Sequence, residues 1–210
     1  MARPAMTLPR AESAPRSRAA AFAFLWTAVN LISAVLAVSA TLFYVFVYTL
    51  WLKRRSVENI VVGGAAGAVP VLVGWTAVTG RLAWAPVVLF AIIFYWTPPH
   101  FWALAVKYRD DYTAANVPML PSVASLAVTA KRILLYTLLL WSVSLLFVPI
   151  GQMGVIYLVA AVVLGAIFTA MAIQLTRETT TAVAMRLFSW SITYVALLFG
   201  AMALYQLVKG

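Results

Sequence analysis

Long apolar runs, almost free of charged residues, dominate the chain. Hydrophobic residues make up 65% of the 210 residues and charged residues only 10%, and the mean hydropathy is +0.99. A helix of about 20 apolar residues spans the hydrocarbon core of a bilayer, where the backbone must satisfy its own hydrogen bonds. The strands of a membrane barrel would instead alternate apolar and polar residues. The sequence therefore predicts an all-α, polytopic transmembrane helical bundle.

The apolar runs predict about six spans. They cover about Ala19–Leu52, Ile60–Gly80, Trp84–Val106, Ile133–Ile150, Gly154–Thr176 and Leu187–Val208. Pro98-Pro99 interrupt the third run, where two prolines remove helical donors and bend a helix. A polar loop is expected over about 107–129, and a tight uncharged turn at Gly151–Gly154.

The first run is long for one span and short for two spans with a turn. One interpretation is a single long, tilted helix. The other is a clipped helix followed by a complete one, with Asn30 marking the turn between them. The sequence alone leaves both open.

The polar N-terminal segment, residues 1–18, contains Arg3, Arg10, Arg16 and Arg18 and only one acidic residue. We expect it to be disordered or to lie at the surface, with residues 19–210 forming the transmembrane domain. Its composition also suits a mitochondrial transit peptide. Because the segment is short, we favour the bacterial inner membrane over the mitochondrial inner membrane.

The net charge of +10 comes from basic residues between the runs. Alternating the loops places most of them on one side: Lys53, Arg54, Arg55, Lys107, Arg109, Lys131, Arg132, Arg177 and Arg186. The other side holds only Arg81 and Lys209. This split follows the positive-inside rule, so it predicts a cytoplasmic or matrix side rather than nucleic-acid binding.

Two clusters on the basic side are candidates for chemistry. Asp110 and Asp111 are adjacent carboxylates, the hard oxygen ligands that hold Mg²⁺ together with substrate phosphates. Lys53-Arg54-Arg55 form a cationic clamp for an anionic head group. The alternative interpretations are a solvated loop for the acidic pair and an orientation signal for the basic cluster.

Two features within the apolar runs have both a structural and a functional interpretation. The small residues of Gly63–Ala68 favour close helix packing, although they also let a ligand approach the backbone. His100, the single histidine, lies deep in the third run. An ionisable residue in a membrane span is a functional candidate, and the alternative is a histidine bonded to carbonyls freed by the prolines.

Taken together, these segments closely resemble the protoheme IX farnesyltransferases, or heme O synthases. The resemblance rests on YVFVYTLWLKRR at Tyr44–Arg55, NIVVGGAAGA at Asn59–Ala68, Gly74-Trp75, WTPPHFWALA at Trp96–Ala105 and VPMLP at Val117–Pro121. It covers roughly Phe24 to the C-terminus. Ser56, Val71 and Asn116 depart mildly from the pattern. The group belongs to the UbiA-type membrane prenyltransferases, which implies the last six of nine helices.

The resemblance implies transfer of a farnesyl group from farnesyl diphosphate to heme b, which makes heme O for a terminal oxidase. It implies Mg²⁺ as cofactor and a lipid bilayer as setting. It also implies heme A synthase or oxidase assembly factors as protein partners, and no nucleic acid. The apolar, aromatic interior would hold the farnesyl tail, exclude water and favour a carbocation through ring faces.

The resemblance assigns roles by position. Asp110 and Asp111 match the second acidic motif and hold Mg²⁺, and with Lys53 and Tyr48 they form the catalytic set. The substrate-binding set, which contacts the diphosphate or positions the reacting groups, is Arg54, Arg55, Lys107, Arg109, Tyr112 and His100.

One departure from the pattern is large. The first acidic motif, an Asn and two Asp after the second helix of the family, is absent from these 210 residues. We therefore expect a member that lacks its N-terminal part and half of the metal site. The alternatives are a catalytically inactive membrane fragment and, ranked last, a small transporter.

Overall fold

A computed structural model describes residues 13–209, and every regular element in this range is a helix. Six segments of it are long and apolar enough to cross a membrane. They are Leu31–Leu52, composed of α2 (Leu31–Leu42) and the π-helix η1 (Phe43–Leu52), and then α3 (Asn59–Thr79), α4 (Trp84–Lys107), α7 (Leu126–Ile150), α8 (Val155–Arg177) and α9 (Thr181–Lys209). The predicted all-α bundle with about six spans is confirmed, and the chain is a multi-pass membrane protein.

The first apolar run is divided at Asn30, so the clipped-helix interpretation is correct and the single tilted helix is wrong. Helix α1 (Ser13–Ala28) ends before Asn30, and α2 begins directly after it. The Asn30 side chain caps α2 by accepting a hydrogen bond from the Ser33 backbone N–H at 2.9 Å. Its amide also donates to the Thr76 carbonyl at 2.7 Å, which fixes this corner against α3.

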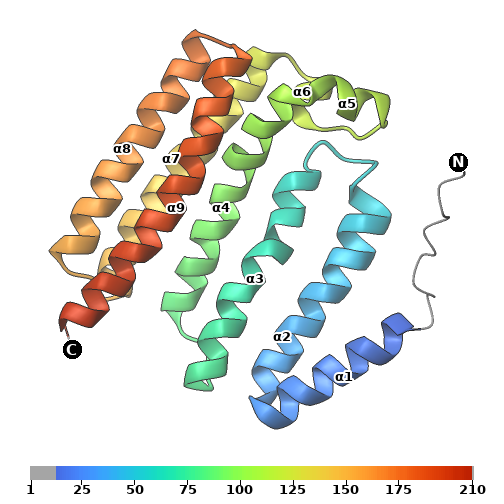
Figure 1. Cartoon of the computed structure of the whole chain (residues 1–210), viewed down its shortest axis with the longest axis vertical. Coiled ribbons are helices and arrows are strands. Elements are labelled where there is room, and N and C mark those ends of the chain that lie inside the picture. Colours follow the sequence, from blue (N-terminus) through green and yellow to red (C-terminus); the bar gives the residue numbers. More distant parts are fainter. Residues whose placement is uncertain (1–12, 210) are drawn as a thin grey trace, which may run out of the picture.

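Helix α1 begins at Ser13, so the last part of the polar N-terminal segment is helical. The remainder of that segment, residues 1–12, lies outside the described residues. Helix α1 contacts α2 and leads away from the rest of the bundle (Figure 1).

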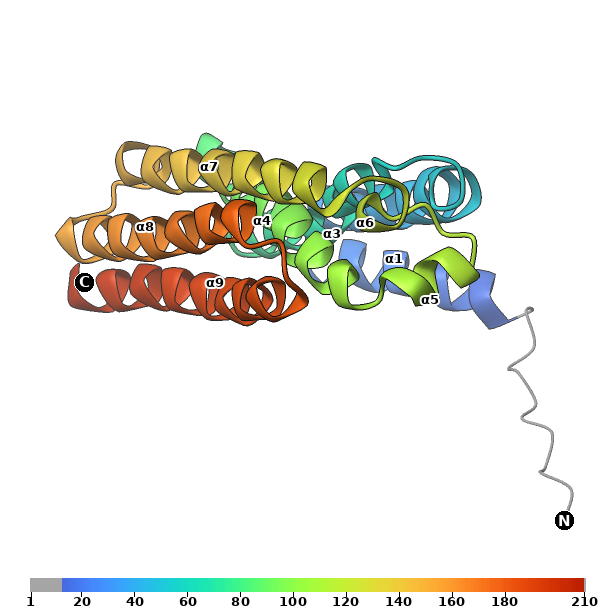
Figure 2. The ribbon, with the colours of Figure 1, turned by 90° about the horizontal axis from the view of Figure 1, so that it is seen from above.

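Helix α4 lies at the centre of the bundle, with α3 and α2 on one side and α7, α8 and α9 on the other (Figure 2). The large, fully buried side chains gather around it, among them Trp102 of α4, Tyr157 and Phe168 of α8, and Tyr194 of α9. Contacts between α3 and α2 involve smaller side chains, with Ala34 and Ala68 fully buried. The core is therefore dense on one side of α4 and built from small residues on the other.

Buried hydrogen bonds join the three C-terminal helices. The Tyr194 hydroxyl lies 2.7 Å from Ser144 Oγ, and the Tyr157 hydroxyl donates to the Ser144 carbonyl at 2.8 Å. Trp141 Nε1 donates to the Ala161 carbonyl at 3.0 Å. Groups that have no water available are thereby paired within the bundle.

The third predicted span is one helix, because α4 continues through Pro98 and Pro99 from Trp84 to Lys107. One prediction about helix boundaries is wrong. The expected loop over about 107–129 contains two short helices, α5 (Arg109–Ala114) and α6 (Leu120–Val123), and the beginning of α7. The tight turn at Gly151–Gly154 is present, with Gln152 in the left-handed region at φ 51°.

The predicted charge split agrees with the arrangement of the helices. The turn after η1, the α5–α6 segment and the α8–α9 connection all lie at one end of the bundle (Figure 1). Arg81, after α3, and Lys209, at the end of α9, lie at the other end. The acidic and basic candidates therefore share one end.

Candidate functional site

The acidic and basic candidates are placed by a small apolar cluster beneath them. Ile60 at the start of α3, Ala105 near the end of α4 and Met119 after α5 are buried against one another, and Tyr112 of α5 packs on them. This cluster holds the short helix α5 over the ends of α3 and α4. Asp110 and Asp111 lie in the first turn of α5, and both side chains are exposed.

Asn59 links the two loops directly. It is only 1% exposed, and its amide nitrogen lies 3.4 Å from the carbonyl of Lys53 and 3.4 Å from that of Pro118. Lys53 belongs to the basic cluster, and Pro118 follows the acidic helix α5. One buried side chain therefore fixes the basic turn relative to the acidic segment.

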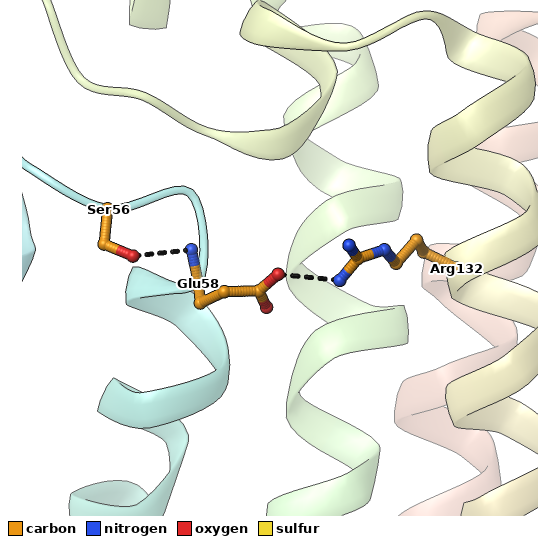
Figure 3. A network of polar contacts seen from close by, with 3 residues as sticks. All are labelled: Ser56, Glu58 and Arg132. Atoms are coloured by element: carbon orange, nitrogen blue, oxygen red, sulfur yellow. Dashed lines mark hydrogen bonds and ion pairs between the residues drawn. The ribbon is translucent and has the colours of Figure 1, made fainter.

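A second contact fixes the basic turn to α7 (Figure 3). The Ser56 hydroxyl accepts a hydrogen bond from the Glu58 backbone N–H at 3.1 Å, and the Glu58 carboxylate pairs with Arg132 at 2.7 Å. This is the one ion pair among residues 20–209, whose side chains the structure describes. Within the same range, Asp110 and Asp111 carry no ion-pair partner, so their carboxylates remain available to a ligand.

An apolar groove of about 910 Å³ lies between the α2–η1 segment, α3 and α4. Four aromatic residues line it: Tyr44, Tyr48, Trp96 and Phe101. It follows α3 from Ile60 to Gly74, which is about 21 Å of helix. The groove begins beneath the basic turn and runs into the membrane-spanning part of the bundle.

The glycines of α3 allow close helix packing at some positions and leave the backbone open to the groove at another. A Cβ at Gly63 would lie 2.5 Å from the Tyr48 ring, and one at Gly64 would lie 3.0 Å from Thr97. These two positions allow close packing. Gly67, in contrast, meets no atom within 4 Å and opens onto the groove.

His100 lies in α4 about 10 Å along the helix from Lys107. Its Nδ1 is 2.7 Å from the hydroxyl of Ser191 in α9, and its ring is stacked between those of Trp96 and Phe188. The partner is thus a hydroxyl of another helix rather than a carbonyl freed by the prolines. No pattern in the sequence points to Ser191, which is 91 residues from His100.

The sequence of the chain matches that of the UbiA prenyltransferase family over residues 17–199. The chain belongs to the UbiA prenyltransferase family. No solved structure was found to match it.

Several curated relatives of the chain carry the same name, protoheme IX farnesyltransferase. The chain is 57% identical over 178 residues to the protoheme IX farnesyltransferase of Parafrankia sp. (strain EAN1pec), covering 83% of this chain and 57% of that protein. It is 55% identical over 183 residues to the protein of that name from Frankia alni, covering 86% of this chain and 63% of that protein. A Synechococcus protein with the same name is 55% identical over 187 residues, covering 88% of this chain and 57% of that protein. The chain thus spans about three fifths of the length of these relatives.

The donor set of this UbiA chain fits one part of a magnesium site. No group of three or more metal-ligating side chains occurs within residues 20–209, whose side chains are described. Asp110 and Asp111 are hard oxygen donors, but neighbouring positions on a helix do not face each other. Mg²⁺ is commonly held by one or two carboxylates together with substrate phosphates and water, and the exposed pair can supply that share.

Proposed function

We propose that this chain transfers a farnesyl group from farnesyl diphosphate to heme b, which yields heme O. The observation that carries the proposal is that the basic turn after η1 and the acidic segment of α5 both lie next to the groove along α3. Asn59 contacts both the basic turn and the segment after the acidic helix α5, and its neighbour Ile60 lines the apolar, aromatic-lined groove. An amphiphile with an anionic diphosphate head and a prenyl tail matches this layout. The names of the relatives supply the acceptor, heme.

The basic residues are proposed to bind the diphosphate. Lys53, Arg54 and Arg55 follow η1, and Lys107 and Arg109 flank the end of α4, with all five side chains exposed. Cations around a departing diphosphate stabilise the charge that develops as its bond to carbon breaks. Arginine suits this role because its planar fork matches phosphate oxygens.

Asp110 and Asp111 would hold Mg²⁺ against the diphosphate oxygens. When bound, the ion neutralises the leaving group and acts as a Lewis acid. The pair lies in the first turn of α5 and follows Lys107 and Arg109 directly in the sequence.

The groove is proposed to hold the farnesyl chain. Tyr48 lies near its mouth, and Tyr44, Trp96 and Phe101 present ring faces and edges along it. Aromatic faces attract a cation, and an apolar wall keeps water away from the reacting carbon. We propose that Tyr112 and His100 help to position the heme.

The proposed chemistry balances with water as co-reactant. The bond between carbon 1 of the farnesyl group and its diphosphate breaks, and diphosphate leaves with the electron pair. The terminal carbon of a heme vinyl group then bonds to carbon 1. Water adds to the inner vinyl carbon and releases a proton, which leaves a hydroxyfarnesylethyl group.

The proposed setting is the cell inner membrane, with the basic end cytoplasmic. The excess of basic side chains at the end that carries the site supports this orientation. Heme A synthase or oxidase assembly factors are the expected protein partners.

Heme O production tests the proposal. The chain is expressed in a host that lacks its own heme farnesyltransferase, and the extracted hemes are separated by chromatography. We expect a heme O peak from the unaltered chain and none from Asp110→Ala or Asp111→Ala. Glu178→Gln is the matched control, because Glu178 is an exposed carboxylate at the same end outside this loop, and it should leave the peak unchanged. Absence of heme O from the unaltered chain, once found in the membrane, would contradict catalysis by these residues.

A further inference from the structure

A second groove, separate from the one along α3, lies between α8 and α9 near the basic end of the bundle. These two helices lie on the opposite side of α4 from α3 (Figure 2). The groove has a volume of about 450 Å³. Its apolar wall is formed by Met171, Met185 and Trp190, and its polar side chains are Arg186, Ser189 and Thr193.

The three polar side chains share one face of α9. Arg186 and Ser189 are three positions apart and Ser189 and Thr193 are four, the spacings that make side chains neighbours on a helix surface. All three are exposed. A guanidinium and two hydroxyl groups therefore line one side of the groove.

Arg186 has a charge that the described part of the chain does not balance. The one ion pair within residues 20–209 joins Glu58 to Arg132, and none of the described residues that line the groove is acidic. A charged side chain in a membrane span is costly unless an opposite charge or a polar surface accompanies it. The groove therefore favours an anion that comes from outside these residues.

The length of α9 places Arg186 at the level of the lipid head groups. The helix has 29 residues and is about 44 Å long, whereas the hydrocarbon core is about 30 Å thick. A centred helix extends about 7 Å beyond the core at each end. Arg186 lies about 8 Å along the helix from Thr181, and its long side chain can extend toward the phosphates. Trp190, one turn deeper, is an aromatic residue of the kind that gathers at this boundary.

We infer that this groove binds one anionic phospholipid from the leaflet at the basic end. The lipid phosphate accepts hydrogen bonds from Arg186 and Ser189, and an acyl chain lies against Met171 and Trp190. A zwitterionic lipid fits less well, because the groove offers its cationic head group no carboxylate. Basic pockets between membrane helices on the cytoplasmic side commonly hold anionic head groups. The inference is independent of the proposed function, since none of these residues lines the groove along α3.

Native mass spectrometry of the whole chain, released from detergent, tests the assignment. The chain is first equilibrated with phosphatidylglycerol, or with phosphatidylcholine that has the same acyl chains. We expect one phosphatidylglycerol to be retained in preference to phosphatidylcholine. Arg186→Gln should weaken phosphatidylglycerol binding about 5-fold, the equivalent of about 1 kcal/mol for one arginine near a lipid surface, and leave phosphatidylcholine binding unchanged. Arg186→Lys keeps the charge and should lose less affinity.

Arg177→Gln is the matched control, because it removes the same charge from the exposed end of α8 outside the groove. Its affinity for phosphatidylglycerol should equal that of the unaltered chain. Inorganic phosphate should not displace the lipid, because it has no acyl chain to place against the apolar wall. Equal phosphatidylglycerol binding by Arg186→Gln and the unaltered chain, or equal losses in both glutamine variants, would overturn the assignment. Displacement by inorganic phosphate would also contradict it, because it would indicate a simple anion site.

Discussion

Replacing Gly165 by alanine would place a methyl group inside the ring of Trp141. Gly165 lies in α8 where it packs against α7, and an added Cβ would overlap Cδ1 and Nε1 of the Trp141 indole. Ordinary contacts begin at 3.4 Å. The indole must therefore move by more than an ångström, or the two helices must separate. Either movement strains the hydrogen bond from Trp141 Nε1 to the Ala161 carbonyl.

The expected loss of stability follows from three contributions. Overpacking a filled site costs about 1–3 kcal/mol, and losing one hydrogen bond costs about 0.5–1.5 kcal/mol. Alanine gains up to about 1 kcal/mol over glycine in helix propensity. The net destabilisation is about 2 kcal/mol, which lowers the melting temperature of a chain this long by about 4–8 °C.

Thermal unfolding in detergent, followed by size-exclusion chromatography after heating, measures this loss. Gly200→Ala in α9 is the control, because a Cβ there meets no atom within 4 Å and the melting temperature should not fall. In a Trp141→Ala background the effect of Gly165→Ala should shrink, since the clash partner is gone. Equal melting temperatures for Gly165→Ala and Gly200→Ala would refute the packing argument.

Two further substitutions test the groove and the core. Gly63→Ala should displace the Tyr48 ring, which lies 2.5 Å from the added Cβ, and lower heme O formation in the host assay by more than it lowers the amount of chain in the membrane. Tyr194→Phe removes the 2.7 Å contact with Ser144 and should cost about 0.6–1.7 kcal/mol, measured as a lower melting temperature. An unchanged heme O yield, or an unchanged melting temperature, would contradict the respective contact.

The existence of the six spans could be predicted from hydropathy. A long apolar run lies in lipid, where the backbone must bond to itself and therefore forms a helix. The ends of the spans could not be predicted, because a helix continues past the hydrocarbon core wherever its backbone bonds continue. Helix α7 begins at Leu126, capped by Ser125, and carries Lys131 and Arg132 within its first turns. Those charges ended the apolar run in the sequence but not the helix.

Adjacent carboxylates and a basic cluster were recognisable as candidates from residue type alone, because carboxylates bind metal cations and basic side chains bind phosphates. The contacts that place them were not, because they join residues far apart in sequence. Asn59 reaches Pro118 across 59 residues, and Glu58 reaches Arg132 across 74. The site residues themselves, from Tyr48 to Tyr112, stay predictions until the substitutions above are measured.

The two sides of α4 explain why a groove persists in this bundle. Aromatic side chains such as Trp141 and Tyr157 fill the space among α7, α8 and α9, whereas Gly67 and Gly74 leave α3 uncovered. In water such an apolar hollow would drive collapse or association. In lipid the acyl chains are as apolar as the groove, so no such force closes it. An apolar groove of this kind gives little discrimination between a lipid tail and a farnesyl chain. In the proposed reaction, selectivity for farnesyl diphosphate would then come from the charged end, where the diphosphate differs most from the head groups of competing lipids.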